Sequence, residues 1–204
     1  MTVGGISVSR VEHQPRDIVV VGASAGGLEA LTRLCARLPR DFSAAVAVVV
    51  HISPTWESAL PSVLARATPL PVVAAANGVA FESRRVYVAI PDRHLLIVDG
   101  SVALRRDAKE HLHRPAIDPL FRSAAEAYGT RVVGVILSGA GSDGVLGAQA
   151  IRAAGGIVLA QDPSEARQSG MPRAAIARNA VDAVLSIERL ARALVRLTTG
   201  EGFD

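Results

Sequence analysis

The feature that most constrains the fold is an alternation between short β-branched runs and longer segments rich in alanine and leucine. Residues 18–22 and 45–51 form apolar runs, whereas residues 28–38 and 57–67 carry apolar side chains at helical spacing. Continuous apolar strands separated by amphipathic helices are typical of a parallel sheet covered on both faces. The sequence therefore predicts an α/β fold with a doubly wound, mainly parallel, Rossmann-like sheet.

The middle of the sequence has a different pattern. Turn-forming pairs such as Asn77-Gly78 and Asp99-Gly100 separate short apolar segments at residues 85–90, 94–98 and 101–105. This spacing favours antiparallel hairpins, so we expect a small antiparallel insertion. The polar stretch that follows, residues 106–115, is predicted to be an exposed loop.

The alternation then resumes and continues to the end of the sequence. The pattern predicts helices at residues 116–129, 144–156 and 186–197 and strands at residues 131–137 and 157–160. We expect one domain at residues 17–197, with a flexible leader at residues 1–16 and a frayed tail at residues 198–204.

Composition excludes several classes of protein. Seven aromatic residues among 204 are too few for a base-stacking platform, and the basic residues are dispersed, so nucleic-acid binding is not expected. The longest apolar run, residues 44–50, is far shorter than the roughly 20 residues that a membrane helix needs. Insertion into a membrane is therefore not expected either.

The single cysteine, Cys35, cannot form an internal disulfide and is predicted to pack in the core. The first 16 residues lack the long apolar segment of a secretory signal. Both features favour a reducing, cytoplasmic compartment.

Chemically suggestive residues follow three of the predicted strands. Ser24 lies in Gly22-Ala23-Ser24-Ala25-Gly26, His51 ends the second strand, and Asp143 lies in a glycine-rich loop after residues 131–137. Ligands of open α/β sheets bind at the carboxyl ends of the strands. We therefore expect these three side chains at the same edge of the sheet.

The segment around Ser24 fits the pattern G-x-S-x-G, in which small neighbours allow a sharp strand-to-helix turn that exposes the serine. Ser24 is therefore a candidate nucleophile. Two alternatives are a serine that caps the helix and a glycine-rich loop that binds phosphate. The loop lacks the Gly-Lys-Ser/Thr of a Walker A motif, and His51 occupies the place where a dinucleotide site would carry an acid.

A serine becomes a strong nucleophile when a base takes its proton, and a carboxylate orients that base. His51 and Asp143 have the chemistry for these two roles. Each has an alternative: His51 as a hydrogen-bonded histidine that closes a buried strand, and Asp143 as the N-cap of the following helix.

At these residues the sequence resembles the catalytic domain of the chemotaxis methylesterase family CheB. The resemblance runs from about Asp17 to Leu197 and is carried by the segments DIVVVGASAGGLEAL, VVVHISP, VYVAIPDRHL, HRPAIDPLFRSAA, GVILSGAGSDGVLGAQAIRAAGG and AQDPSEARQSGMPRAA and by the final helix.

The resemblance implies roles for individual residues. Ser24 is implied as nucleophile, His51 as base and Asp143 as orienting acid, with backbone donors near Ala25 and Ala140 for the oxyanion. It also implies that Asp92, His94 and Met171 lie near the substrate groove and that no cofactor or metal is needed. Family members often carry methionine where Ala140 stands, so we expect a wider pocket wall here.

The implied function is hydrolysis of glutamate methyl esters on the cytoplasmic signalling domain of chemoreceptors, with release of methanol, and deamidation of receptor glutamine. The alternatives are a scaffold that binds receptors without catalysis and a nucleotide- or phosphate-binding module. The family's receiver domain does not occur in this sequence, so we expect a separate receiver or adaptor protein to supply regulation.

The segment at residues 106–115 carries two further features. His111 and His113 have H-x-H spacing, but no matching ligands are evident in the sequence, so we expect them to be solvated loop residues rather than metal ligands. The segment and the residue before it also carry a basic cluster, which consists of Arg105, Arg106, Lys109 and Arg114. We expect this cluster to be a solvated face, and the alternative is a surface that binds an acidic receptor helix.

Overall fold

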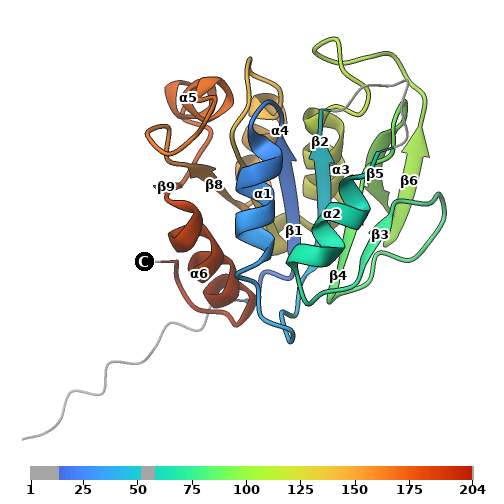
Figure 1. Cartoon of the computed structure of the whole chain (residues 1–204), viewed down its shortest axis with the longest axis horizontal. Helices are drawn as coiled ribbons and strands as arrows, with labels where there is room; N and C mark the ends of the chain where they lie inside the picture. Colours follow the sequence, from blue (N-terminus) through green and yellow to red (C-terminus); the bar gives the residue numbers. More distant parts are fainter. Residues whose placement is uncertain (1–13, 52–57, 204) are drawn as a thin grey trace, which may run out of the picture.

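The computed structural model describes residues 14–51 and 58–203 and has a seven-stranded parallel sheet at its centre (Figure 1). The strand order is β3-β4-β2-β1-β7-β8-β9. The strands are β1 (Ile18–Ala23), β2 (Ala45–Val50), β3 (Val72–Ala74), β4 (Arg85–Val88), β7 (Val132–Ile136), β8 (Ile157–Gln161) and β9 (Ala183–Leu185). This architecture confirms the predicted doubly wound α/β fold.

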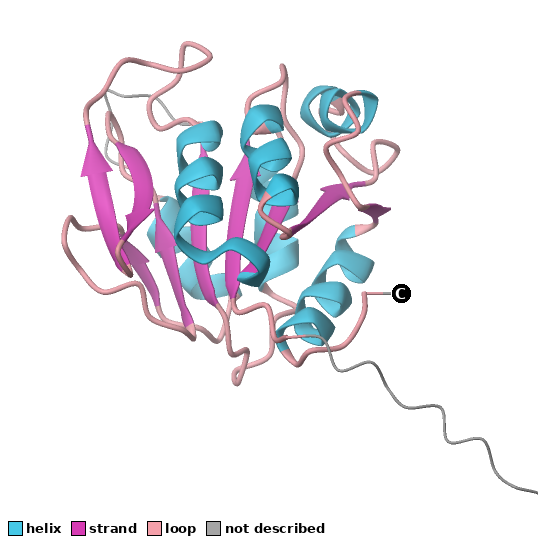
Figure 2. Ribbon diagram, turned by 180° about the vertical axis from the view of Figure 1, so that it is seen from behind, coloured by secondary structure: helices cyan, strands magenta, loops and turns pink. Residues whose placement is uncertain are grey.

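Helices cover both faces of the sheet (Figure 2). One face is covered by α1 (Gly27–Cys35), α2 (Leu60–Ala67) and α6 (Ile187–Thr198), and the other by α3 (Ile117–Tyr128), α4 (Val145–Ala153) and α5 (Gly170–Ala177). A 3₁₀ turn, η1 (Gly129–Arg131), leads from α3 into β7. None of the helices in the described ranges is long and apolar enough to cross a membrane.

The β-branched runs form strands because both of their faces are buried. Along β1, Val19 and Val21 belong to the core under α1, α2 and α6, whereas Ile18 and Val20 belong to the core under α3, α4 and α5. Every residue of β1 and of β2 is buried. A strand that alternates its side chains between two apolar layers needs no polar face, which explains the continuous apolar runs.

The antiparallel insertion is smaller than the sequence predicts. Of the strands in residues 14–51 and 58–203, only β5 (His94–Val98) and β6 (Ser101–Arg105) form an antiparallel hairpin. The prediction that residues 85–90 belong to the hairpins is wrong, because β4 pairs in parallel with β2 and joins the main sheet. The buried side chains of Val86, Tyr87 and Val88 are well matched to that interior position.

Residues at both ends of the described chain bond to the body of the domain. Arg16 donates its backbone N–H to the carbonyl of Leu197 and its guanidinium to the carbonyls of Thr130 and Gly155. At the other end, the N–H groups of Thr199, Gly200 and Glu201 bond back to the last turn of α6. The rest of the predicted leader, residues 1–13, and Asp204 of the predicted tail lie outside the described residues.

Cys35 lies in the core beneath α1, as predicted, and is 2% exposed. Burial raises the pKa of its thiol to about 12, because a thiolate would lose its hydration there. The side chain therefore packs as a small apolar group.

A pair of leucines on α1 tests the contribution of the core. Leu31 is fully buried, whereas Leu28 is 43% exposed. Leu31→Ala should lower the free energy of unfolding by about 2–5 kcal/mol, because it removes buried methyl groups and leaves a cavity. Leu28→Ala, the matched control, should change it by about 0.5 kcal/mol or less. Chemical denaturation measures both, and equal losses would contradict the assigned burial.

Candidate active site

The three side chains singled out from the sequence lie together at the carboxyl ends of β1, β2 and β7. His51 Nδ1 is 3.1 Å from Ser24 Oγ, and His51 Nε2 is 2.7 Å from Asp143 Oδ2. These residues, called the triad below, converge because their strands are neighbours in the sheet. The distances define a continuous hydrogen-bonded series from hydroxyl to imidazole to carboxylate.

Ser24 occupies the sharp turn between β1 and α1. Its backbone N–H donates to the carbonyl of Ser138 at 3.0 Å, which ties the turn to the loop after β7. The turn requires Gly26, whose φ of 74° favours glycine. Gly26 is also the N-cap of α1, and no side chain in the described part of the sequence caps this helix. The structure therefore does not use the Ser24 hydroxyl as a helix cap.

A second glycine lets the loop after β7 approach the serine. A Cβ on Gly139 would lie 2.8 Å from Ser24 Cβ and 2.1 Å from Met171 Sδ, so any larger residue would displace the loop. The loop is fixed from behind by Ser138, whose N–H donates to the Gln161 side chain and whose hydroxyl bonds to Ala25 and Gln168.

The predicted oxyanion donors are the backbone N–H groups of Ala25 and Ala140. Both residues are exposed, and neither N–H has an acceptor within residues 14–51 and 58–203. Ala25 precedes the N-terminus of α1, where the helix dipole favours negative charge. These amides have the free donor capacity that an oxyanion needs.

The side chain of Asp143 is held by the N-terminus of α3, not by that of α4, the helix that follows it in the sequence. Its Oδ2 accepts from the N–H of Ile117 at 2.7 Å, and its Oδ1 accepts from the N–H of Asp118 at 3.0 Å. The following helix, α4, has Gly144 at its N-cap without a side-chain cap. The carboxylate therefore accepts hydrogen bonds from the first two backbone N–H groups of α3, which have no partner within that helix. This arrangement stabilises a buried anion.

These contacts decide the charge of Asp143. Burial alone pushes the pKa of this carboxyl upward, but the hydrogen bonds from His51 and from the amides of Ile117 and Asp118 outweigh burial and lower it. An ionised Asp143 accepts a hydrogen bond from the Nε2–H group of His51, and this leaves Nδ1 as acceptor for the Ser24 hydroxyl. The geometry can thus remove a proton from the serine.

The loop at residues 106–116 contributes to the site, which the sequence did not predict. The ring of His113 stacks on the ring of His51 with a centroid separation of 3.6 Å and an interplanar angle of 13°. The prediction of His113 as a solvated loop residue is therefore wrong. Burial, and then the neighbouring His51, lower the pKa of His113. The H-x-H spacing was the only signal in the sequence for this contact.

Asp92 and His94 hold that loop in place. The Asp92 carboxylate accepts hydrogen bonds from the guanidinium groups of Arg114 and Arg106, and the bond from Arg114 is the main cause of its lowered pKa. His94 is 2% exposed, with Nε2 bonded to the carbonyl of Ala108 and Nδ1 to the N–H of Ala116. The contacts of both residues anchor the loop that bears His113.

Met171 lies next to the site but within the core. It is fully buried, and its sulfur packs against Gly139 behind Ser24. Its side chain therefore supports the wall from inside rather than lining an open groove.

The basic cluster predicted from the sequence is partly neutralised. Two of its members, Arg106 and Arg114, form ion pairs with Asp92.

His111 and Asp118 form a second imidazole–carboxylate pair beside the triad. His111 Nε2 is 2.9 Å from Asp118 Oδ2, and Asp118 Oδ1 accepts from the N–H of Gly147 at 2.6 Å. Asp118 is fully buried, and burial raises its pKa despite these hydrogen bonds. His111 is exposed in the loop, as predicted, but the sequence did not predict its bond to Asp118.

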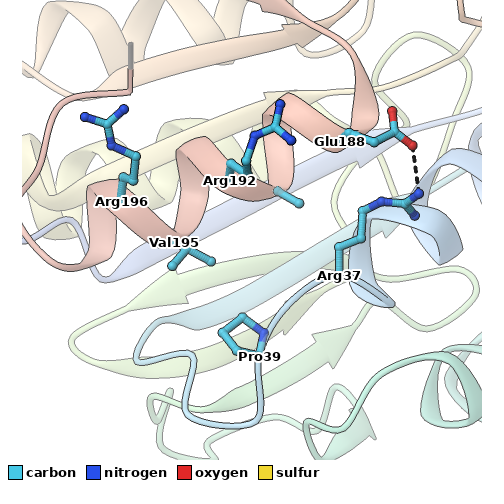
Figure 3. Close-up of a pocket in the computed structure, with 7 residues that line it drawn as sticks. Arg37, Pro39, Glu188, Arg192, Val195 and Arg196 are labelled. Carbon is cyan, nitrogen blue, oxygen red and sulfur yellow. Dashed lines mark hydrogen bonds and ion pairs between the residues drawn. The ribbon is translucent and has the colours of Figure 1, made fainter.

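A groove of about 560 Å³ between α6 and the segment after α1 contains none of the predicted site residues (Figure 3). Its lining combines apolar side chains with arginines, and Arg37 pairs with Glu188 at 2.7 Å. The triad lies at the carboxyl ends of the strands, so the groove and the triad are separate features.

Comparisons with known proteins identify the family of this chain. The family model described as CheB methylesterase matches residues 19–194. The chain is 42% identical over 182 residues to "Protein-glutamate methylesterase/protein-glutamine glutaminase 2" of Anaeromyxobacter dehalogenans, covering 89% of this chain and 53% of that protein. It is 36% identical to a putative protein of the same name from Leptospira interrogans, covering 89% of this chain and 94% of that one.

The fold is shared with a solved structure. The "Thermotoga maritima CheB methylesterase catalytic domain" superposes with a TM-score of 0.85 and 34% sequence identity, covering 90% of this chain and all of that one. The chain spans about half the length of several curated relatives that it matches, the Anaeromyxobacter protein among them. The match of the family model across most of the sequence shows that this chain belongs to the CheB methylesterase family.

Proposed function

We propose that this protein is a serine esterase that hydrolyses glutamate methyl esters on the signalling domains of chemoreceptors and releases methanol. The observation that carries the proposal is the unbroken hydrogen-bonded series from Ser24 through His51 to Asp143. Membership of the CheB methylesterase family and relatives that bear the name protein-glutamate methylesterase support the choice of ester.

The proposed reaction begins at the serine. Ser24 Oγ attacks the ester carbonyl while its proton passes to His51 Nδ1, and the carbonyl oxygen becomes an oxyanion that accepts hydrogen bonds from the N–H groups of Ala25 and Ala140. The imidazolium then protonates the departing methoxide, so methanol leaves and an acyl-enzyme remains. Water, deprotonated by His51, cleaves that ester and restores the Ser24 hydroxyl.

The same residues can carry out a second reaction. An amide carbonyl of receptor glutamine would form the same acyl-enzyme, with ammonia in place of methanol as the leaving group. Relatives named protein-glutamine glutaminase support this second activity. We further propose a cytoplasmic location, because the substrate of this reaction is the cytoplasmic domain of a chemoreceptor.

His113 is proposed as a positioning residue. Its ring lies flat against the base, so it limits the orientations of His51 without contacting the reacting atoms. Its lowered pKa favours the neutral form, which adds no repulsion when His51 gains a proton.

Replacement of the nucleophile tests the activity. Ser24→Ala should lower methanol release from methylated receptor on the order of 10⁶-fold, by analogy with serine proteases that lose their nucleophile. Ser142→Ala, the same substitution in the nearby glycine-rich loop, is the control and should retain activity. Equal rates for the Ser24→Ala variant and the parent would refute the assignment, and receptor binding without methanol release by the parent would favour a scaffold.

Replacement of the stacked ring tests the positioning role. His113→Ala should lower kcat by about 10-fold to 100-fold with little change in KM, because a freer His51 spends less time aligned with Ser24. His113→Phe keeps a planar ring at this position and should recover most of kcat. Steady-state kinetics measures both constants. A His113→Phe variant as slow as His113→Ala would show that stacking is not the cause.

The charge of Asp143 predicts a pH-dependent stability. Its pKa is lower in the folded protein than in the unfolded chain, so its stabilisation is present above the unfolded pKa and is lost as the pH falls through the folded pKa. Lowering the pH from 7 to 3 should therefore reduce the free energy of unfolding of the parent more than that of Asp143→Asn. Denaturant unfolding at both pH values measures it. If the free energy of unfolding of the parent fell less than that of Asp143→Asn at pH 3, the lowered pKa of Asp143 would be contradicted.

A further inference from the structure

A compact donor set shares Asp143 with the triad, and its other two residues, His111 and Asp118, have no part in the reaction proposed above. His111 Nε2 is 2.9 Å from Asp118 Oδ2 and 3.9 Å from Asp143 Oδ1, and one ligand atom from each of the three residues lies within 4.8 Å of the others. Tetrahedral ligands at zinc-like bond lengths of ~2.0–2.1 Å are ~3.3 Å apart. The separations of 2.9 Å and 3.9 Å fall on either side of that spacing, so a small divalent cation fits with slight movement.

The carboxylates of Asp118 and Asp143 each have an oxygen atom that can accept a further bond. Asp118 Oδ1 is held by the N–H of Gly147, which leaves Oδ2 toward His111. Asp143 Oδ1 accepts one bond, from the N–H of Asp118. Since each carboxylate oxygen can accept two bonds, Asp118 Oδ2 and Asp143 Oδ1 can bind a cation without losing their backbone donors. Backbone amides thus fix both carboxylates before any metal arrives, as outer-shell partners do in metal sites.

The charge of the cluster favours a divalent cation. Asp118 is 0% exposed and Asp143 is 2% exposed. Among the described residues, the ion-pair partners of these two carboxylates are the imidazoles of His51 and His111 alone. Two buried carboxylates with a neutral imidazole and one divalent cation give a neutral site, which offsets the cost of burying the charges.

The third ligand also gives access from solvent. The side chain of His111 is 34% exposed, so solvent reaches this member of the cluster. His111 and the next residue, Leu112, have φ values of 49° and 67°. This uncommon backbone conformation turns the loop so that the imidazole meets Asp118.

We propose that His111, Asp118 and Asp143 form a three-ligand site for a zinc-like divalent cation, and that its occupation inhibits the triad. On binding, a neutral His111 carries its proton on Nδ1, so that unprotonated Nε2, Asp118 Oδ2 and Asp143 Oδ1 bond to the cation. Asp143 then shares its negative charge with the metal and stabilises a protonated His51 less. The binding half of this proposal stands on the cluster alone, whereas the inhibition rests on the proposed function.

Direct binding measurements test the site without reference to activity. Isothermal titration calorimetry of the untagged full chain with Zn²⁺ should give one site per chain. His111→Asn should weaken it on the order of 100-fold or more, because loss of even an outer-shell partner costs 10-fold to 100-fold. Asp107→Asn, in the same exposed stretch of loop, is the control and should bind as the parent does. Asp118→Asn provides a second ligand variant should His111→Asn fail to fold.

The inhibition is tested separately by methanol release. Zn²⁺ should lower the rate of the parent and of Asp107→Asn, a chelator should restore it, and the rate of His111→Asn should not respond to the same Zn²⁺ concentration. Absence of Zn²⁺ binding, or equal affinity in the parent and both ligand variants, would overturn the site. Binding that requires His111 but leaves the rate of an active parent unchanged would overturn the inhibition. A parent without esterase activity would overturn the proposed function and leave the calorimetric result intact.

Discussion

The site depends on the carboxylate of Asp143 and the two backbone amides that hold it. An aspartate that is 2% exposed would ordinarily bind a proton, yet the first amides of α3 and the imidazole of His51 keep its pKa low. An ionised Asp143 fixes the Nε2 proton of His51, and this leaves Nδ1 free to accept from Ser24. The start of α3 therefore determines the protonation pattern of a histidine that lies on a different strand.

The sheet supplies the remaining geometry. β2, β1 and β7 are adjacent, so the ends of these strands bring three distant parts of the sequence to one edge. The loop at residues 106–116 then lies against the imidazole of His51. It is held there because Asp92 binds the Arg114 side chain and His94 binds the loop backbone. Support from the sheet, from α3 and from this loop gives His51 contacts on several sides. Positioning of this kind is what proton transfer from a serine requires.

Much of this arrangement could be predicted from the sequence. The apolar runs predicted the central strands, and the rule that ligands bind at the carboxyl ends of strands predicted that Ser24, His51 and Asp143 would lie together. The parallel pairing of β4 was not predicted, because turn-forming residues on both sides of residues 85–90 also suit a hairpin. Its partner, β2, is distant in the sequence, and local patterns do not specify such pairings.

The contribution of residues 106–116 was missed for a related reason. The segment is polar, and polarity alone favours a solvated loop. Its position is set by ion pairs of Arg114 and Arg106 with Asp92 and by the buried His94, all of which are long-range contacts. The same is true of Met171, whose burial behind Gly139 depends on how α5 packs.

The central claim is that folding turns one serine into a nucleophile by placing it against a histidine that is itself held by a buried carboxylate. Labelling of the intact protein with a fluorophosphonate, followed by mass spectrometry of its peptides, tests this claim most directly. The reagent forms a bond between phosphorus and the serine oxygen and releases fluoride. The account predicts a single adduct, on Ser24, whose formation slows sharply in His51→Ala. A parent protein that stays unlabelled, or that carries the label on a different serine, would contradict it.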